Sequence, residues 1–166
     1  KKAPSHFLID IQPQQIEKIK TTALSYLGDN SFNSQPMLRG RILQINGQLV
    51  QDLKVDKEVE WVLRRDRAFS WSNEMPKNTK LITGKWWSKN YDGPLLVSIG
   101  DKIAKGMNLK IGDKIKFNIL GRNFEAQIFN TREIIWEEMD INFVFILSNS
   151  NIANASKEFM ESNTMI

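Results

Sequence analysis

The residues that could take part in chemistry are few in this sequence of 166 residues. Three carboxylates fall close together, at Glu137, Glu138 and Asp140. A glycosidase needs two carboxyl groups that face each other across a cleft, whereas neighbouring residues of an extended segment point to opposite faces. We therefore interpret the three carboxylates as a solvated acidic turn around Met139 rather than as a catalytic pair.

Other kinds of reactive site lack their residues. The sequence has a single histidine, His6, and no cysteine, so we expect no metal site and no thiol chemistry. Gly100 to Gly106 is similar to a phosphate-binding glycine loop only in outline, because Met107 stands where that loop needs lysine. The GxSxG motif of serine hydrolases is absent. We expect no catalytic residue, no cofactor and no enzymatic activity. A hydrolase without a recognisable motif would need a pocket that holds at least two converging carboxylates, and we expect no such pocket.

The sequence is mildly basic, with 23 lysines and arginines against 19 acidic residues and a pI of about 9.3. Five arginines could meet lipid head groups or phosphates, namely Arg39, Arg41, Arg64, Arg65 and Arg67. Acidic residues between Asp52 and Asp66 lie before and among the last three of these arginines. We therefore favour a charged face in water over a binding patch.

Two adjacent tryptophans, Trp86 and Trp87, are the most unusual pair in the sequence. If they lie in a strand, one ring faces the core and the other faces outward. An exposed tryptophan can mark a partner or lipid surface, and it can also cover a junction between subdomains, which we favour slightly. Trp136 and Met139 are the other candidates for contact with a partner or substrate.

The stretch from residue 95 to residue 128 contains the clearest succession of structural elements. Apolar residues alternate with polar ones along its second half, as in half-buried strands. The pattern predicts a strand over 95–99, a helix over 102–107 with Asp101 as its N-cap, strands over 115–119 and 124–128, and a hairpin turn at 121–123.

The rest of the chain alternates helices and strands around this stretch. The pattern predicts strands over 7–11 and 37–45, helices over 13–27 and 56–63, a brief edge strand over 69–71, a strand over 143–147 and a helix over 151–160. The dipeptide Asn46-Gly47 predicts a tight turn. This order indicates an α+β frame with a β-rich insertion.

No run approaches the roughly 20 apolar residues that a membrane-spanning helix needs, and the first residues do not form a signal peptide. The sequence begins and ends abruptly. We therefore expect an excised domain of a longer protein, whose missing flanks hold the membrane helices.

Four segments in order resemble the large extracytoplasmic domain of bacterial ABC-transporter permeases of the MacB/FtsX superfamily, in particular the YbbP-type permeases. They are MLRGRILQING (37–47), LITGKWW (81–87), MNLKIGDKIKFNILGRNFEAQI (107–128) and REIIWEEMDINFVFIL (132–147). Lys85 departs from the pattern, where arginine or a small residue is expected. The resemblance implies an α+β fold with a porter-like βαβ frame of residues 1–52 and 129–166, and a β-rich subdomain of residues 53–128 inserted in it.

The resemblance also implies a function. Such a domain is a non-catalytic, periplasmic part of an inner-membrane protein, with no catalytic residues to carry over. It would couple ATP-driven membrane movements to export of a lipid-like or other hydrophobic substrate, or to a periplasmic partner. A separate cytoplasmic ATPase subunit would be its partner in the transporter. The alternative is a nucleic-acid-binding module, which predicts Lys114, Lys116 and Arg122 on one face with exposed aromatics.

Overall fold

The computed structural model describes Leu8, residues 11–27, Phe32, 34–77, 79–135 and 142–149. The chain divides into two compact units, one of residues 1–35 and 135–142 and the other of residues 36–134 and 143–166. The predicted strand over 7–11 falls mostly outside the described residues, and the predicted helix over 151–160 falls wholly outside them.

The first unit contains helix α1, Pro13–Leu27, at the predicted position. Ile16, Ile19 and Ala23 are half-buried, whereas Tyr26 is exposed. The spacing of three and four residues therefore identified the apolar stripe of the helix correctly up to Ala23.

In the described residues, the second unit is built on one mixed sheet. Its elements are β1 (Leu38–Ile45), β2 (Gln48–Leu49), the 3₁₀ turn η1 (Val50–Asp52), α2 (Trp61–Arg64), β3 (Arg67–Trp71), β4 (Leu81–Gly84), β5 (Leu96–Gly100), α3 (Asp101–Gly106), β6 (Lys114–Ile119), β7 (Arg122–Arg132) and β8 (Phe145–Leu147). The predicted strands over 37–45, 95–99 and 143–147 are confirmed as β1, β5 and β8, with small shifts at their ends.

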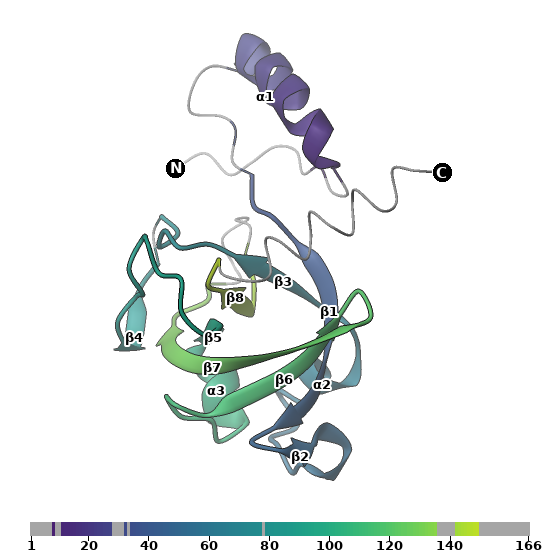
Figure 1. The fold of residues 1–166 in the computed structure, drawn as a ribbon, viewed down its shortest axis with the longest axis vertical. Helices are drawn as coiled ribbons and strands as arrows, with labels where there is room; N and C mark the ends of the chain where they lie inside the picture. Colours follow the sequence, from purple (N-terminus) through teal and green to yellow (C-terminus); the bar gives the residue numbers. More distant parts are fainter. Residues whose placement is uncertain are drawn as a thin grey trace. The chain divides into compact units, whose positions relative to one another are not determined.

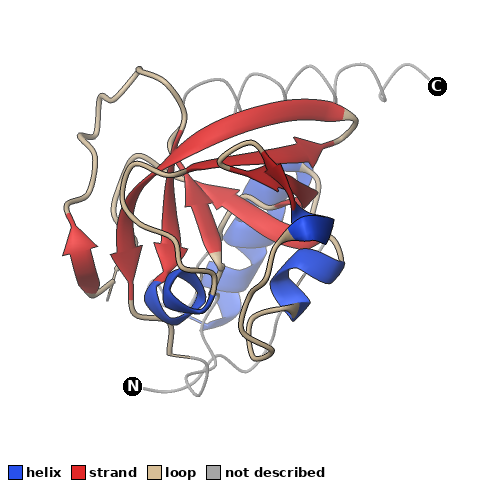
Figure 2. Ribbon diagram, turned by 90° about the horizontal axis from the view of Figure 1, so that it is seen from below, coloured by secondary structure: helices blue, strands red, loops and turns tan. Residues whose placement is uncertain are grey.

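The sheet closes on itself as a six-stranded barrel (Figures 1 and 2). Its strands follow one another around the ring in the order β1, β3, β8, β5, β7, β6 and back to β1. The β3–β8 and β5–β7 pairs are parallel and the other pairs of the ring are antiparallel. Strands β2 and β4 pair outside the ring, on β1 and β7.

Helices and strands thus combine as an α+β fold with a mixed sheet. Strands that we assigned to the frame, such as β1, pair directly with strands that we assigned to the insertion, such as β6. The barrel therefore takes the place of a distinct βαβ layer in the described part of the chain. The domain boundaries at residues 52 and 128 stay a prediction.

Phenylalanine rings from three strands fill the middle of the barrel. Phe69 of β3 stacks on Phe117 of β6 and on Phe145 of β8, with 4.9 Å between ring centroids in each pair. Gly40 of β1 lies against this cluster, since an added Cβ would come within 2.5 Å of Ile119 Cγ1. The close approach explains why β1 has glycine at an inward-facing position.

The barrel core continues into the short helices beside it. Val59 and Val62, before and within α2, belong to the same buried cluster as Ile103 and Met107 of the α3 segment. The backbone at Gly106 packs directly on Val59. Helix α2 is shorter than the predicted helix over 56–63, although the predicted apolar side is buried.

Three local predictions were wrong. Strand β3 is not an edge strand, because β1 and β8 pair on its two sides. Asp101 is the first residue of α3 rather than its N-cap, which is Gly100; the Asp101 carboxylate instead accepts a bond from Thr131 Oγ1 at 2.9 Å. The β6–β7 turn consists of Leu120 and Gly121, so it begins one residue earlier than predicted and is one residue shorter.

Candidate functional site

The two tryptophans lie next to each other, on the same side of the chain. The segment after β4 is not a strand, so the two rings do not alternate between opposite faces, although one is buried and the other partly exposed as expected. The Trp86 and Trp87 rings are 4.3 Å apart between centroids and tilted by 31°. Trp87 is 4% exposed, while Trp86 is half-buried. The pair therefore forms one aromatic wall, with Trp87 as its buried half.

Both indole groups hold the segment that follows β3. Trp87 Nε1 donates to the carbonyl oxygen of Ser72 at 3.0 Å, and Trp86 Nε1 donates to that of Asn73 at 3.1 Å. Because the two acceptors are consecutive, the tryptophans fix the path of the backbone as it leaves the barrel.

Asn73 links this segment to two others. Its Nδ2 donates to the carbonyl oxygen of Tyr91 at 3.0 Å, and its Oδ1 accepts a bond from the Asn149 backbone N–H at 2.8 Å. The Ser72 backbone N–H donates to the carbonyl oxygen of Leu147. The Asn73 side chain is thus a fixed part of the framework, with both polar atoms engaged.

A hollow of about 390 Å³ opens beside this framework. Its lining is one aromatic face, three polar residues, a proline and a pair of opposite charges: Pro36, Trp71, Ser72, Asn73, Glu74, Lys89 and Asn149. Lys89 Nζ and Glu74 Oε1 are 2.5 Å apart. Their hydrogen bond and mutual charge lower the pKa of the Glu74 carboxyl and raise that of the Lys89 ammonium group.

The chemistry of the hollow suits contact rather than reaction. It offers an aromatic surface for an apolar group and a paired charge at its rim, with no nucleophile that is activated by a base. Among the described residues no cluster of three or more His, Cys, Asp or Glu side chains could hold a metal ion. Sequence reasoning identified the two tryptophans but missed Trp71 and Asn73, which are separated from them by more than ten residues.

Other candidates from the sequence are not placed. Trp136 and Met139 lie outside the described residues, as do Glu137, Glu138 and Asp140. His6 lies outside them as well. Their parts in any contact surface stay predictions.

The strand register separates the cations that a nucleic-acid-binding face would need. Lys114 and Lys116 alternate with the buried Ile115 and so lie on the outside of the barrel. Arg122 lies opposite the buried Ile119, on the other face of the same sheet. The geometry therefore removes the main support for the nucleic-acid-binding alternative.

Sequence reasoning also missed a buried arginine. Arg132, at the end of β7, is 4% exposed. Its guanidinium donates to Ser98 Oγ at 3.1 Å, to the carbonyl oxygen of Val144 at 3.5 Å and to that of Phe143. Burial lowers the pKa of Arg132 to about 10, so the group remains protonated at neutral pH. It joins β5 and β7 to the segment that leads into β8.

Replacing either tryptophan by phenylalanine should destabilise the protein, but by different amounts. We expect Trp87→Phe to lower the free energy of unfolding by about 1–3 kcal/mol, because the carbonyl oxygen of Ser72 loses its donor beside a ring that is only 4% exposed, where water has little access. Trp86→Phe should cost less, about 0.5–1.5 kcal/mol, because water can reach the freed acceptor beside a half-exposed ring. Urea denaturation of both variants measures the difference, and an equal or reversed order contradicts this account.

Comparison with known proteins finds a distant relative of the chain, although no protein-family profile matches it. The chain is a distant homologue of an ABC transporter permease. The relative is the uncharacterized ABC transporter permease YbbP of Escherichia coli (strain K12), with 26% identity over 147 residues. The match covers 87% of this chain and 17% of the relative. In the described residues no helix is both long enough and apolar enough to cross a membrane.

Proposed function

We propose that this chain is the periplasmic, MacB-like domain of a bacterial inner-membrane ABC permease, with no catalytic activity of its own. The alignment with an ABC transporter permease over 147 residues carries the proposal, since it takes in most of the barrel. The proposal includes membrane helices in the flanking parts of a longer protein and a porter-like frame that connects the barrel to them.

In this proposal the domain acts through movement. A cytoplasmic ATPase subunit of the same transporter binds and hydrolyses ATP, and the membrane helices change position. The domain then passes between two arrangements and couples them to export of a lipid-like or other hydrophobic substrate, or to a periplasmic partner. A rigid closed barrel suits this role because it transmits displacement without deforming.

The hollow beside Trp86 and Trp87 is the contact surface that we propose for the substrate or partner. The Trp71 side chain that lines it offers an aromatic face to apolar groups, and the Lys89–Glu74 pair provides polar contacts at its rim. Trp136 and Met139 are proposed as further contact residues for the substrate or partner.

Chemical labelling of the full-length permease tests on which side of the membrane the domain lies. The chain has no cysteine, so Lys89→Cys introduces a unique thiol at the hollow in a permease whose other cysteines are replaced. We expect a membrane-impermeant maleimide to label this thiol equally in intact spheroplasts and after lysis. A single cysteine in the ATPase subunit is the control and should react only after lysis. Labelling of Lys89→Cys only after lysis would overturn the proposed function.

A further inference from the structure

The β6–β7 turn has an unusual residue at its tip. Leu120 and Gly121 have φ values of 52° and 80°, the left-handed pair of a two-residue hairpin turn. The β1–β2 turn has nearly the same geometry, with φ of 49° and 80°, and uses Asn46 and Gly47. Asparagine tolerates this conformation, whereas a leucine there is strained by its Cβ. The chain thus places leucine where its own matching turn has a residue that fits better.

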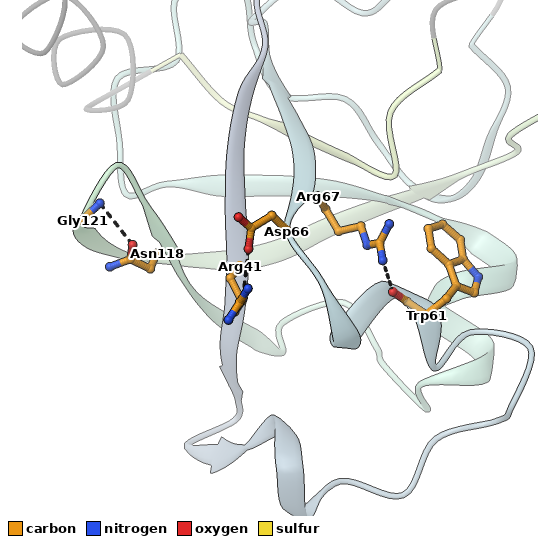
Figure 3. A network of polar contacts seen from close by, with 6 residues as sticks. All are labelled: Arg41, Trp61, Asp66, Arg67, Asn118 and Gly121. Carbon is orange, nitrogen blue, oxygen red and sulfur yellow. Dashed lines mark hydrogen bonds and ion pairs between the residues drawn. The ribbon is translucent and has the colours of Figure 1, made fainter.

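The strained leucine is also exposed. Leu120 is 39% exposed at the end of the hairpin, where burial in the barrel does not explain its apolar side chain. Asn118 supports the turn by accepting a bond from the Gly121 backbone N–H at 3.2 Å (Figure 3). Backbone strain that folding does not require points to a function for the residue that carries it.

Two arginines flank this apolar tip. In the antiparallel β1–β6 register, Arg41 lies opposite Asn118 and Gly40 lies opposite Ile119. Continuing this register by one residue on each strand places Arg39 beside Leu120. Figure 3 shows Arg41 on the strand next to the turn, paired with Asp66 at 2.9 Å. Arg39 is exposed and forms no ion pair within the part of the chain that the structure describes. Exposed Arg122 directly follows the turn.

We propose that the tip of the β6–β7 hairpin docks on the surface of an anionic lipid bilayer, with Leu120 inserted between head groups and Arg39 and Arg122 against the phosphates. An apolar side chain flanked by two cations matches the layered chemistry of a bilayer surface, where anionic groups lie above hydrocarbon. The net charge of +4 favours the same partner. The inference deepens the proposed function and rests on it for the nearby membrane, because the relative is a permease.

Vesicle binding by the 166-residue chain tests this docking. We expect the chain to co-sediment at low salt with vesicles of phosphatidylglycerol and phosphatidylcholine in equal parts, and much less with phosphatidylcholine alone. Leu120→Asn should lower the partition coefficient about three- to tenfold by removing the apolar contact. Arg39→Gln should lower it about fivefold, and added salt should weaken the binding of every variant.

The stability of Leu120→Asn separates lost docking from misfolding. Asparagine relieves the strain of the turn, so its melting temperature should be unchanged or raised by about 2–4 °C while binding falls. Leu49→Asn is the matched control, since Leu49 is 44% exposed on a different hairpin and its removal should leave binding unchanged. Absence of vesicle binding by the wild type at low salt, or equal binding by wild type and Leu120→Asn, would overturn the inference. Neither result affects maleimide labelling of the permease, so failure of the docking and failure of the proposed function can be told apart.

Discussion

Phe69→Ala is expected to lower the free energy of unfolding by about 3–5 kcal/mol, the largest effect of any single change considered for this chain. Phe69 is 1% exposed and stacks on rings from two other strands. Its loss removes buried apolar surface and leaves a cavity that the closed ring of strands cannot collapse to fill. Urea denaturation followed by tryptophan fluorescence measures the effect.

Phe124→Ala is the matched control for this prediction. Phe124 lies at the outer end of the same stack, 5.9 Å from Phe117 between centroids, and is half-buried. Its removal should cost about 1–2 kcal/mol, because less surface returns to water and no closed cavity forms. Equal losses for the two variants would show that Phe69 is not the centre of the core.

Arg132→Met is expected to destabilise the fold by about 2–4 kcal/mol, although it removes a buried charge. Methionine fills similar space without donating hydrogen bonds. The hydroxyl of Ser98 and the carbonyl oxygens of Phe143 and Val144 therefore lose a donor in a buried setting. Relief of the desolvation cost that lowers the Arg132 pKa offsets part of this loss.

An exposed arginine provides the comparison. Arg41 pairs with Asp66 on the outside of the barrel, with side chains that are 59% and 51% exposed. Arg41→Met should cost less than about 1 kcal/mol, because water screens such pairs and solvates the freed carboxylate. If thermal and urea unfolding give similar losses for Arg132→Met and Arg41→Met, the buried guanidinium does not hold the strands together.

Local elements of this chain follow from local sequence, and the closed sheet does not. The stripe of Ile16, Ile19 and Ala23 predicts α1, and the dipeptide Asn46-Gly47 predicts its turn, because both depend on neighbouring residues. Barrel closure depends on pairs such as Phe69 with Phe145. An alternating pattern indicates that a strand has two faces, but not which strand lies beside it.

A bulge in β7 decides on which face of the barrel the buried arginine lies. Val97 pairs with Ile128 but Ser98 pairs with Asn130, so one residue of β7 is skipped in the β5–β7 register. The side-chain alternation therefore reverses: unbroken alternation from Ile128 would turn Arg132 inward, whereas Arg132 lies on the outer face with Ser98. The carbonyl groups of Phe143 and Val144 contact it there, and neither the bulge nor these contacts can be read from the local sequence. The tryptophan pair was recognisable by residue type, whereas its bonds to Ser72 and Asn73 came from the fold.

The parallel pairing of β3 with β8 also has a consequence for the order of events in synthesis. Phe69 meets Phe145 across that pair, so the ring of strands closes only through contacts between distant parts of the chain. Such contacts form slowly because a long loop must be ordered before they stabilise anything. Until Leu147 has been made, β3 and β5 each lack a neighbour and present open edges to other chains. The nascent domain is therefore most prone to aggregation just before β8 emerges.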